Sequence, residues 1–542
     1  MPVIDITTMR GEMPRVVAHL LPQENATVAN NCHFRFGVVS PVMADADTGK
    51  VFTFKPQTIF HYRDDFWFAW KGIVDVIRSP VAQDQYTRIY YTDGAYPKVT
   101  SSQIATTGNG NYPSASFRLG IPAPANAVTV AQITPPDDHD DDDPTDDETR
   151  IYVETYVTAY GEEGPPGPAS DEVTIVYPGS SVDLQLQPPG SQNNNITRRR
   201  IYRSVTGGGS ADFLLVAETD IGVRTFRDNV ADKDLGPVLE TYNYLQPPDN
   251  MIGLCLMANG IAAGFAGNQV MFSEAYLPYA WPDDYKQSTE HDIVAIAAIG
   301  TGLVVGTKGY PYLFTGVSPS SINNSKLPVM QACVSRQSMV SMDGFALYAS
   351  PNGLVSVDAS GNAIVATEKI IEAKQWRKQF NPASIRAWQV EGEYYALYTT
   401  ANNTVAGFIF DPESMDIRHF NTVFDAAHNV LEEDTLYVAK GTKLYTAQNS
   451  TNPLPVTWRS KEFLALNSTA FSCLRIKSDS IQRVGINLYA DRQLALSLPP
   501  GSLQDSTLKL PPLVASRWQV EIWGYAQVDR VTLSTSMEEM PA

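Results

Sequence analysis

The chain has 542 residues, with 59 acidic against 40 basic side chains and a formal net charge of −19, which argues against a basic groove that grips nucleic acid through its phosphates. Hydrophobic residues make up 43% of the chain, a globular composition, and a chain of this length is expected to form about two to four domains. No apolar run approaches the roughly eighteen residues of a membrane-spanning helix, and the first residues lack the basic start and apolar core of a signal peptide, so we expect no export by that route.

The cysteines are Cys32, Cys255, Cys333 and Cys473, far apart in the sequence. No pair has the CxxC spacing of a zinc or redox motif. We therefore predict free thiols that are buried as small apolar side chains, consistent with synthesis in a reducing cytosol.

Residues 1–120 contain short strand patterns. Residues 26–42 alternate well enough for one or two strands, and residues 58–62 face the aromatic run 66–70 across a short polar turn, as in a β-hairpin. His33 and His61 lie inside these patterns, so we expect packed or surface side chains rather than ligands. We assign residues 1–120 to the N-terminal part of a β-propeller.

The residue composition and the strand pattern change in residues 121–248. A strand over 127–133 leads into the acidic run 135–148, which lacks the alternate ligands and central glycine of an EF-hand. A solvated, self-repelling loop is the default interpretation, and cation binding by residues 137–148 stays open.

Segments in which apolar and polar residues alternate follow the acidic run. About seven short strands separated by turn residues predict a fibronectin-III-like or immunoglobulin-like sandwich, inserted into the propeller. Residues 207–210 read as a hairpin tip. Besides 127–133, the predicted strands are 150–160, 172–177, 182–186, 199–203, 213–218 and 224–227.

Residues 249–452 contain a recurring hairpin. Its clearest copy has apolar runs at 261–265 and 270–272 around a turn at Gly267 and Asn268. Looser copies follow at 303–314, 346–357, 394–410 and 436–445. A spacing of about 40 to 50 residues favours propeller blades over a generic all-β sandwich. The only helix of any length is expected at 368–379.

Residues 453–542 begin with a proline-containing linker and continue with alternating strands. They predict a C-terminal β-sandwich module. The expected fold is therefore all-β: a β-propeller with an inserted fibronectin-III/Ig-like β-sandwich and a C-terminal β-sandwich.

Four segments carry a resemblance to a known family. Residues 259–282, residues 199–204 with 213–218, and residues 458–463 resemble the tail nozzle (tail tubular) proteins of short-tailed bacteriophages. The similarity spans most of the chain from about residue 121 onward. Its signature residues are Gly264, Phe265, Gly267, Asn268, Phe272, Ser273, Glu274, Tyr276, Pro278, Trp281 and Pro282.

The resemblance implies a structural virion protein of the tail, assembled in the host cytoplasm, and no enzyme. Such subunits form a ring, usually a homo-hexamer, below the portal and adaptor proteins. Tail fibre or tip proteins are further expected partners, and viral double-stranded DNA leaves through the lumen without sequence-specific binding. The resemblance carries no catalytic, cofactor-binding or metal-binding residues. If acidic side chains face the lumen, DNA slides past them without being held.

The competing class is a carbohydrate-binding or glycoside-hydrolase β-propeller. Glycoside hydrolysis needs two carboxylates at a defined separation. The visible acidic clusters are Asp283 with Asp284, Glu391 with Glu393, and residues 432–434. None lies in a catalytic motif, and neither Gly-x-Ser-x-Gly nor His-Glu-x-x-His is present.

Overall fold

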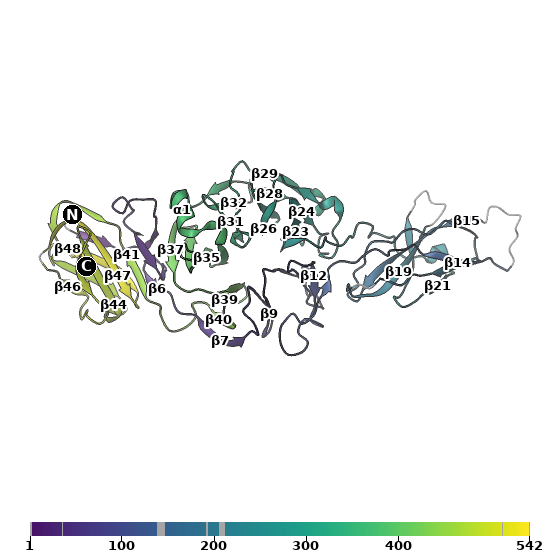
Figure 1. Cartoon of the computed structure of the whole chain (residues 1–542), viewed down its shortest axis with the longest axis horizontal. Coiled ribbons are helices and arrows are strands. Elements are labelled where there is room, and N and C mark those ends of the chain that lie inside the picture. The colour runs from purple at the N-terminus through teal and green to yellow at the C-terminus, as the bar shows by residue number, and fades with distance from the viewer. Residues whose placement is uncertain are drawn as a thin grey trace. The chain divides into compact units, whose positions relative to one another are not determined.

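The computed structural model describes residues 3–34, 36–137, 147–190, 193–204, 212–511 and 513–540. The chain divides into two compact units. The first unit comprises Met1–Gly72, Val294–Phe314 and Ser325–Ala542, and the second comprises Ile73–Ile293 and Thr315–Asn324. Strands dominate both units (Figure 1). Among the described residues the one α-helix is α1 (Ala373–Phe380), so the chain is all-β, as the sequence predicts.

The second unit contains two four-stranded sheets in which neighbours in the sequence are neighbours in the sheet. The first consists of β10 (Asp75–Arg78), β11 (Ile89–Thr92), β12 (Lys98–Thr100) and β13 (Phe117–Arg118). The second consists of β22 (Ile252–Leu256), β23 (Ala262–Ala266), β24 (Gln269–Phe272) and β25 (Gln287–Ser288). All pairs in both sheets are antiparallel. The hairpin expected at 261–272 is thereby confirmed.

Between these two sheets the chain forms a separate set of strands. One three-stranded sheet has the order β14-β18-β21, a second has the order β16-β19-β20, and β15 pairs with β17. Their bounds are β14 (Thr129–Thr134), β15 (Asp147–Arg150), β16 (Tyr152–Thr158), β17 (Val173–Val176), β18 (Ser181–Gln185), β19 (Ile196–Ser204), β20 (Phe213–Asp220) and β21 (Thr225–Asp228). The strands predicted here are confirmed.

We call residues 129–228 the inserted region, because they lie in the sequence between these two sheets. The sheets of this region share one apolar core. Val182 and Leu184 of β18 contribute to it, as do Tyr152 of β16 and Ile201 of β19. Most of the acidic run, residues 138–146, and the glycine-rich stretch 205–211 lie outside the described residues. A short 3-10 helix, η2 (Asp232–Asp234), follows the last strand.

Further strands follow β25 and its preceding 3-10 helix η3 (Asp283–Tyr285) along the chain. They are β26 (Ile293–Ile299), β27 (Gly302–Thr307), β28 (Tyr312–Thr315) and β29 (Asn323–Lys326), with η4 (Pro319–Ser321) before β29 and η5 (Arg336–Ser338) after it. The strands expected within 303–314 correspond to β27 and β28.

The first unit has two more meanders of four strands in sequence order, and the second of them is part of a larger sheet. Helix α1 and η6 (Pro382–Ser384) connect them, and α1 packs its Trp376 and Phe380 into a core that both meanders share. The helix begins five residues later than the sequence predicts. The strands are β30 (Val340–Ser341), β31 (Phe345–Ser350), β32 (Gly353–Asp358) and β33 (Ala363–Val365), then β34 (Arg386–Val390), β35 (Glu393–Thr399), β36 (Val405–Asp411) and β37 (Asp416–Phe420).

A strand from near the N-terminus completes the next sheet. β7 (Ala46–Val51) pairs with β40 (Lys443–Thr446), beyond β38 (Ala426–Val430) and β39 (Thr435–Lys440). The hairpin of β8 (Thr58–Arg63) and β9 (Phe66–Trp70) follows β7, as predicted. Trp67 of β9 packs in the same apolar cluster as Ala439 of β39. Residues 46–51 and residues 426–446 therefore belong to one sheet.

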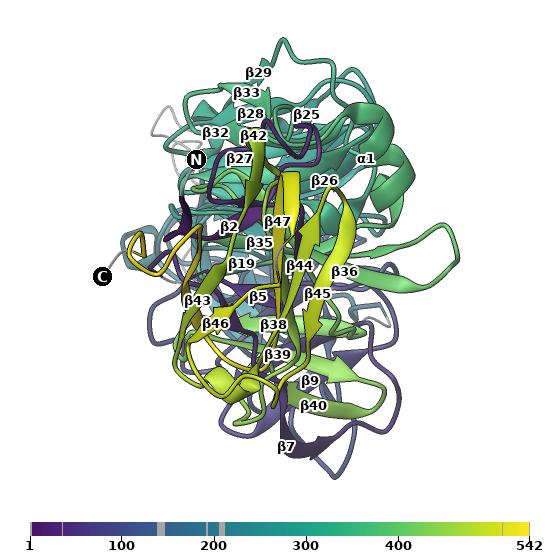
Figure 2. The same ribbon diagram turned by 90° about the vertical axis from the view of Figure 1, so that its left-hand side faces the viewer.

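The last part of the chain also includes N-terminal strands. β1 (Val3–Ile6) pairs with β48 (Val528–Ser534), which pairs with β43 (Cys473–Ser478), and β46 (Thr507–Lys509) completes that sheet. A second sheet contains β41 (Val456–Arg459), β42 (Phe463–Ala470), β44 (Val484–Ala490), β45 (Gln493–Leu498) and β47 (Val514–Gly524). Figure 2 shows the strands β43 to β47 of these two sheets. Both sheets share one apolar core.

A short N-terminal segment extends this second sheet. β4 (Val28–Asn30) lies between β41 and β37, and β2 (Arg10–Glu12) pairs with β3 (Asn25–Ala26) and β37. Two further short strands, β5 (Cys32–His33) and β6 (Ser40–Pro41), pair with each other, and η7 (Ile481–Arg483) precedes β44. Residues 3–33 thus pair largely with strands more than 380 residues away, which the sequence did not predict.

Candidate functional site

The signature residues of the hairpin have structural roles. Gly264 and Phe265 of β23 pair with Met271 and Val270 of β24. A Cβ on Gly264 would lie 2.7 Å from the sulfur of Met251, so only glycine fits without movement of that side chain. Gly267 makes the turn with a φ of +59°, a conformation that favours glycine.

The polar signature residues bond within the hairpin and its exit. Ser273 is buried; its Oγ accepts from the Ala262 amide at 3.0 Å and donates to the Glu274 carbonyl at 2.8 Å. The Asn268 amide donates to the Thr289 carbonyl at 3.0 Å. The Glu274 carboxylate accepts from the Tyr285 hydroxyl at 2.8 Å. These hydrogen bonds hold the hairpin and its exit in place, and they do not present a reactive group.

The remaining signature residues form the exit turn. Tyr276 has a φ of +63°, and its amide donates to the Gly260 carbonyl at 2.8 Å. Trp281 is 1% exposed, and its indole N–H donates to the Pro278 carbonyl at 2.7 Å. Phe272 is buried and Pro282 precedes η3. The signature therefore specifies architecture, and its residues do not converge on a reactive centre.

Several of the acidic side chains named from the sequence are engaged in pairs. Glu393 accepts two hydrogen bonds from the Arg418 guanidinium, both at 2.6 Å. Glu433 accepts from the Tyr437 hydroxyl at 2.6 Å. Asp283 forms an ion pair with Lys286. Each of these three carboxylates is therefore held by a neighbouring side chain.

Two other acids of those clusters meet at one cavity. Glu391 and Asp434 both line a cavity of about 360 Å³ in the first unit, together with Tyr395, His33 and Gln448. Burial raises the pKa of Tyr395 to about 12, so its hydroxyl stays protonated near neutral pH. The Gln448 amide donates to that hydroxyl at 3.4 Å. The sequence named both acids but gave no indication that they share a cavity.

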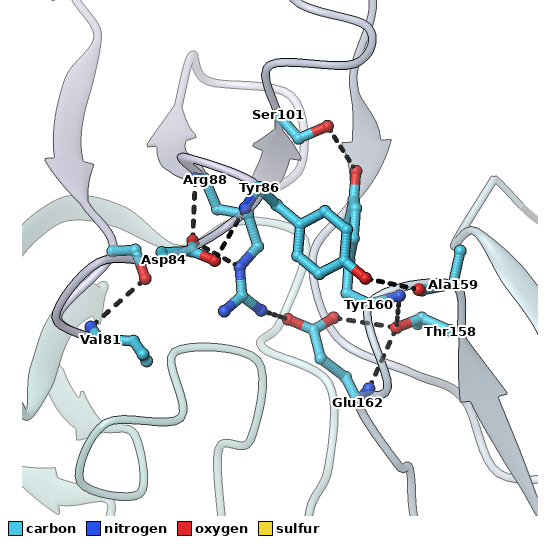
Figure 3. Close-up of polar contacts among 10 residues, drawn as sticks. Val81, Asp84, Tyr86, Arg88, Ser101, Thr158, Ala159, Tyr160 and Glu162 are labelled. Carbon is cyan, nitrogen blue, oxygen red and sulfur yellow. Dashed lines mark hydrogen bonds and ion pairs between the residues drawn. The ribbon is translucent and has the colours of Figure 1, made fainter.

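A partly buried ion cluster links two loops of the second unit (Figure 3). Arg88 donates to Asp84 at 2.8 Å and to Glu162 at 2.6 Å. Burial raises the pKa of Glu162, and the Arg88 guanidinium opposes that rise. The Tyr86 hydroxyl donates to the Ala159 carbonyl at 3.3 Å, and Tyr160 donates to Ser101 at 2.9 Å. Because its charged groups bond one another, the cluster joins the β10–β11 loop to the turn after β16.

The inserted region also buries arginines that sequence reasoning missed. Arg199 of β19 is fully buried and donates to Glu154 at 2.8 Å. Arg203 donates to Asp228 at 2.7 Å, and both side chains are fully buried. A signal was present, because Arg199, Ile201 and Arg203 alternate onto one face of a strand. The apolar Ile201 identifies that face as the inner one.

Three of the cysteines, Cys32, Cys333 and Cys473, are buried free thiols, and Cys255 is half-buried and forms no disulfide. The described part of the chain contains no group of three or more His, Cys, Asp or Glu side chains placed to hold a metal ion. Among the same residues, no helix is long and apolar enough to cross a membrane.

Comparisons with known proteins identify no family. No protein-family model matches the chain, and no curated protein matches it. Among solved structures, BamB from Moraxella catarrhalis is 11% identical over 54% of this chain and 88% of its own, with a TM-score of 0.23. YCF48 from Cyanidioschyzon merolae is 10% identical over 54% and 96%, with a TM-score of 0.26. The Neurospora crassa Pan2 WD40 domain is 8% identical over 73% and 90%, with a TM-score of 0.28. Similarity this low carries no argument about the present chain.

Proposed function

We propose that this chain is the tail nozzle subunit of a short-tailed bacteriophage, a wall protein and not an enzyme. The observation that carries the proposal is the chemistry of the signature segment at residues 259–282. Its glycine, serine, tryptophan and proline residues take part in turn geometry, backbone hydrogen bonds and packing. Residues used in this way stabilise the fold and form no reactive site, as a channel subunit requires.

The proposed architecture is a β-propeller with a fibronectin-III-like insert and a C-terminal β-sandwich. The four-stranded meanders have the strand order of propeller blades. A closed ring of blades must also join its beginning to its end. The pairing of β7 with β40, across almost 400 residues of sequence, supplies such a junction.

The acidic charge suits a passage for DNA. Duplex DNA carries about one negative charge per 1.7 Å of its axis, and basic side chains would hold it by releasing counterions. A ring of six subunits would carry six times the formal charge of −19. With acidic side chains on the channel wall, DNA would leave without being gripped. A reconstruction that shows a lumen lined mainly by lysine and arginine would refute this part of the proposal.

The proposal assigns the chain to the virion tail, assembled in the host cytoplasm. Its partners are five further copies of itself, the adaptor and portal proteins above the ring, and tail fibre or tip proteins around or below it. Viral double-stranded DNA is a transient occupant of the lumen and makes no sequence-specific contact.

Electron microscopy of the purified chain, alone and mixed with the adaptor complex, tests the proposal. We expect closed rings with a central channel wide enough for duplex DNA, on the adaptor if not alone. A chain that stays monomeric in both samples, and does not bind the adaptor complex, would contradict the proposal.

One observation favours a second candidate, a carbohydrate-binding or carbohydrate-cleaving protein. Glu391 and Asp434 line one cavity together with the Tyr395 side chain, and paired carboxylates are the usual catalytic groups of glycosidases. This candidate predicts cleavage of a chromogenic glycoside, or binding in a glycan array, that is lost in Glu391→Gln and in Asp434→Asn. Replacement of the exposed Glu413 by Gln is the matched control. The wall-protein proposal predicts neither cleavage nor glycan binding by the purified chain.

A further inference from the structure

A narrow junction connects the β34–β37 meander to the C-terminal sheets in the first unit. We call it the N-terminal seam: β2, β4 and the facing strand β37. β2 contacts β37 through the pair Glu12–Ile417, and β4 contacts it through the pair His419–Asn30. The Asn31 amide adds one hydrogen bond to the His419 carbonyl, at 2.8 Å. Because these strands share so few ladder pairs, the stability of the N-terminal seam depends on the side chains packed between them.

Two carboxylates are enclosed in the N-terminal seam. Asp416 is 1% exposed, and one of its oxygens accepts from the Gly11 amide at 2.9 Å. Its other oxygen is buried and has no hydrogen-bond partner among the described residues. The Glu12 carboxyl accepts from the Ala29 amide at 2.7 Å. A Cβ on residue 11 would lie 2.5 Å from Asp416, so Gly11 permits this close approach.

Positive charge around these carboxylates is scarce. Arg418 of β37 is buried, but its two terminal nitrogens bond Glu393 of β35. His419 lies with its Nε2 3.9 Å from Glu12. Cys32 of β5 and Tyr398 of β35 also face the cluster and are neutral when protonated. Asp411 also acts on Asp416 with its negative charge, so four carboxylates lie around one permanent cation, the guanidinium of Arg418.

An excess of buried negative charge is unfavourable, because desolvation of an unpaired carboxylate costs free energy. The direction of the pKa changes agrees with this geometry. Burial raises the pKa of Glu12 to about 7, and the charge of Asp416 adds to that rise. Burial likewise raises the pKa of Asp416 and lowers the pKa of His419. Retaining a proton on a carboxyl group, rather than charging the histidine, is the favoured way to reduce the charge.

We propose that the N-terminal seam is a proton-operated latch. While the Glu12 carboxyl retains its proton, β2 and β4 stay on β37. When that proton is lost to solvent, repulsion between Glu12 and Asp416 and the cost of burying both charges loosen the segment of residues 10–33. The device changes how firmly the N-terminal strands hold the β34–β37 meander, and it requires no ligand.

Hydrogen–deuterium exchange on the full chain tests the latch, with protection factors corrected for the intrinsic effect of pH. In the unaltered protein, we expect protection over residues 10–33 and 416–420 to fall about tenfold between pH 6 and pH 8, since one pKa unit corresponds to a tenfold change. Glu12→Gln should retain the high protection at both values. Glu413→Gln, at an exposed turn near β37, is the matched control and should behave like the unaltered protein.

A second variant separates the latch from a merely structural role. Asp416→Asn keeps an oxygen for the Gly11 amide but removes the charge that opposes ionisation of Glu12. The pH at which protection falls should therefore shift downward in this variant. The proposal is overturned if the unaltered protein shows no local fall in protection, if Glu12→Gln shows the same fall, or if Asp416→Asn leaves its midpoint unchanged.

Discussion

The inserted region and the N-terminal seam both bury carboxylates, but they balance the charge differently. In the insert, the buried Glu154 faces the buried Arg199 at 2.8 Å, one acid to one guanidinium. In the seam, the Arg418 guanidinium bonds Glu393 and attracts Asp416, while the charge of Asp416 opposes ionisation of Glu12. The same apolar surroundings therefore have different consequences. A matched pair holds a strand in place, whereas an excess of acid makes the packing depend on a proton.

Breaking the matched pair in the insert should have the largest effect on stability. Arg199→Met leaves Glu154 buried without its guanidinium, and removal of one partner from a buried pair costs about 3–5 kcal/mol. The free energy of unfolding of the insert should fall by that amount, measured by calorimetry or denaturant titration on the full chain. Replacing both partners, as in Glu154→Leu with Arg199→Met, should restore at least about 1 kcal/mol of this loss. No recovery in the double variant would mean that the comparison is wrong for the insert.

Neutralising the unmatched acid should instead stabilise the seam, in a pH-dependent way. The folded-state pKa of Glu12 is raised from 4.5 to about 7. The stability contributed by its protonated form is therefore complete below about pH 4.5 and lost as the pH rises through about 7. The free energy of unfolding of Glu12→Gln should equal that of the unaltered protein near pH 4.5. At pH 8 it should be higher, by at most roughly 3 kcal/mol. Thermal unfolding of both proteins at the two pH values measures this, and an equal gain at both would contradict it.

The signature hairpin provides a baseline without buried charge. Gly264→Ala adds a methyl group against the Met251 side chain, and overpacking of this kind costs about 1–3 kcal/mol at any pH. In a Met251→Ala background the same substitution should cost much less. A double-mutant cycle on unfolding free energies measures the difference. A penalty that is unchanged in that background would show that Met251 is not the obstacle.

An exposed ion pair should give the smallest effect. Arg227 and Asp183 form a forked pair, with both bonds at 2.7 Å, on the solvent side of the insert. Water and salt screen such a pair. Arg227→Met should leave the unfolding midpoint unchanged within error, the matched contrast to Arg199→Met. A loss as large as that of Arg199→Met would show that burial does not decide the cost.

The sequence predicted local structure well and long-range pairing poorly. The alternation in residues 199–203 and the Gly267–Asn268 turn identify β19 and the β23–β24 hairpin because period and turn chemistry are local signals. The pairing of β1 with β48, and of Glu12 with Ile417, joins residues more than 400 positions apart. No local pattern encodes such partners. The seam and the cavity at Glu391 and Asp434 could not be predicted for the same reason.

The central claim is that this chain is a wall of the channel through which a viral genome leaves. A reconstruction of the intact particle tests it most directly, by locating the chain relative to the portal axis. The account predicts a ring of copies centred on that axis, with the four-stranded sheets enclosing the lumen. Copies placed away from the axis, or a particle that lacks the chain altogether, would contradict it.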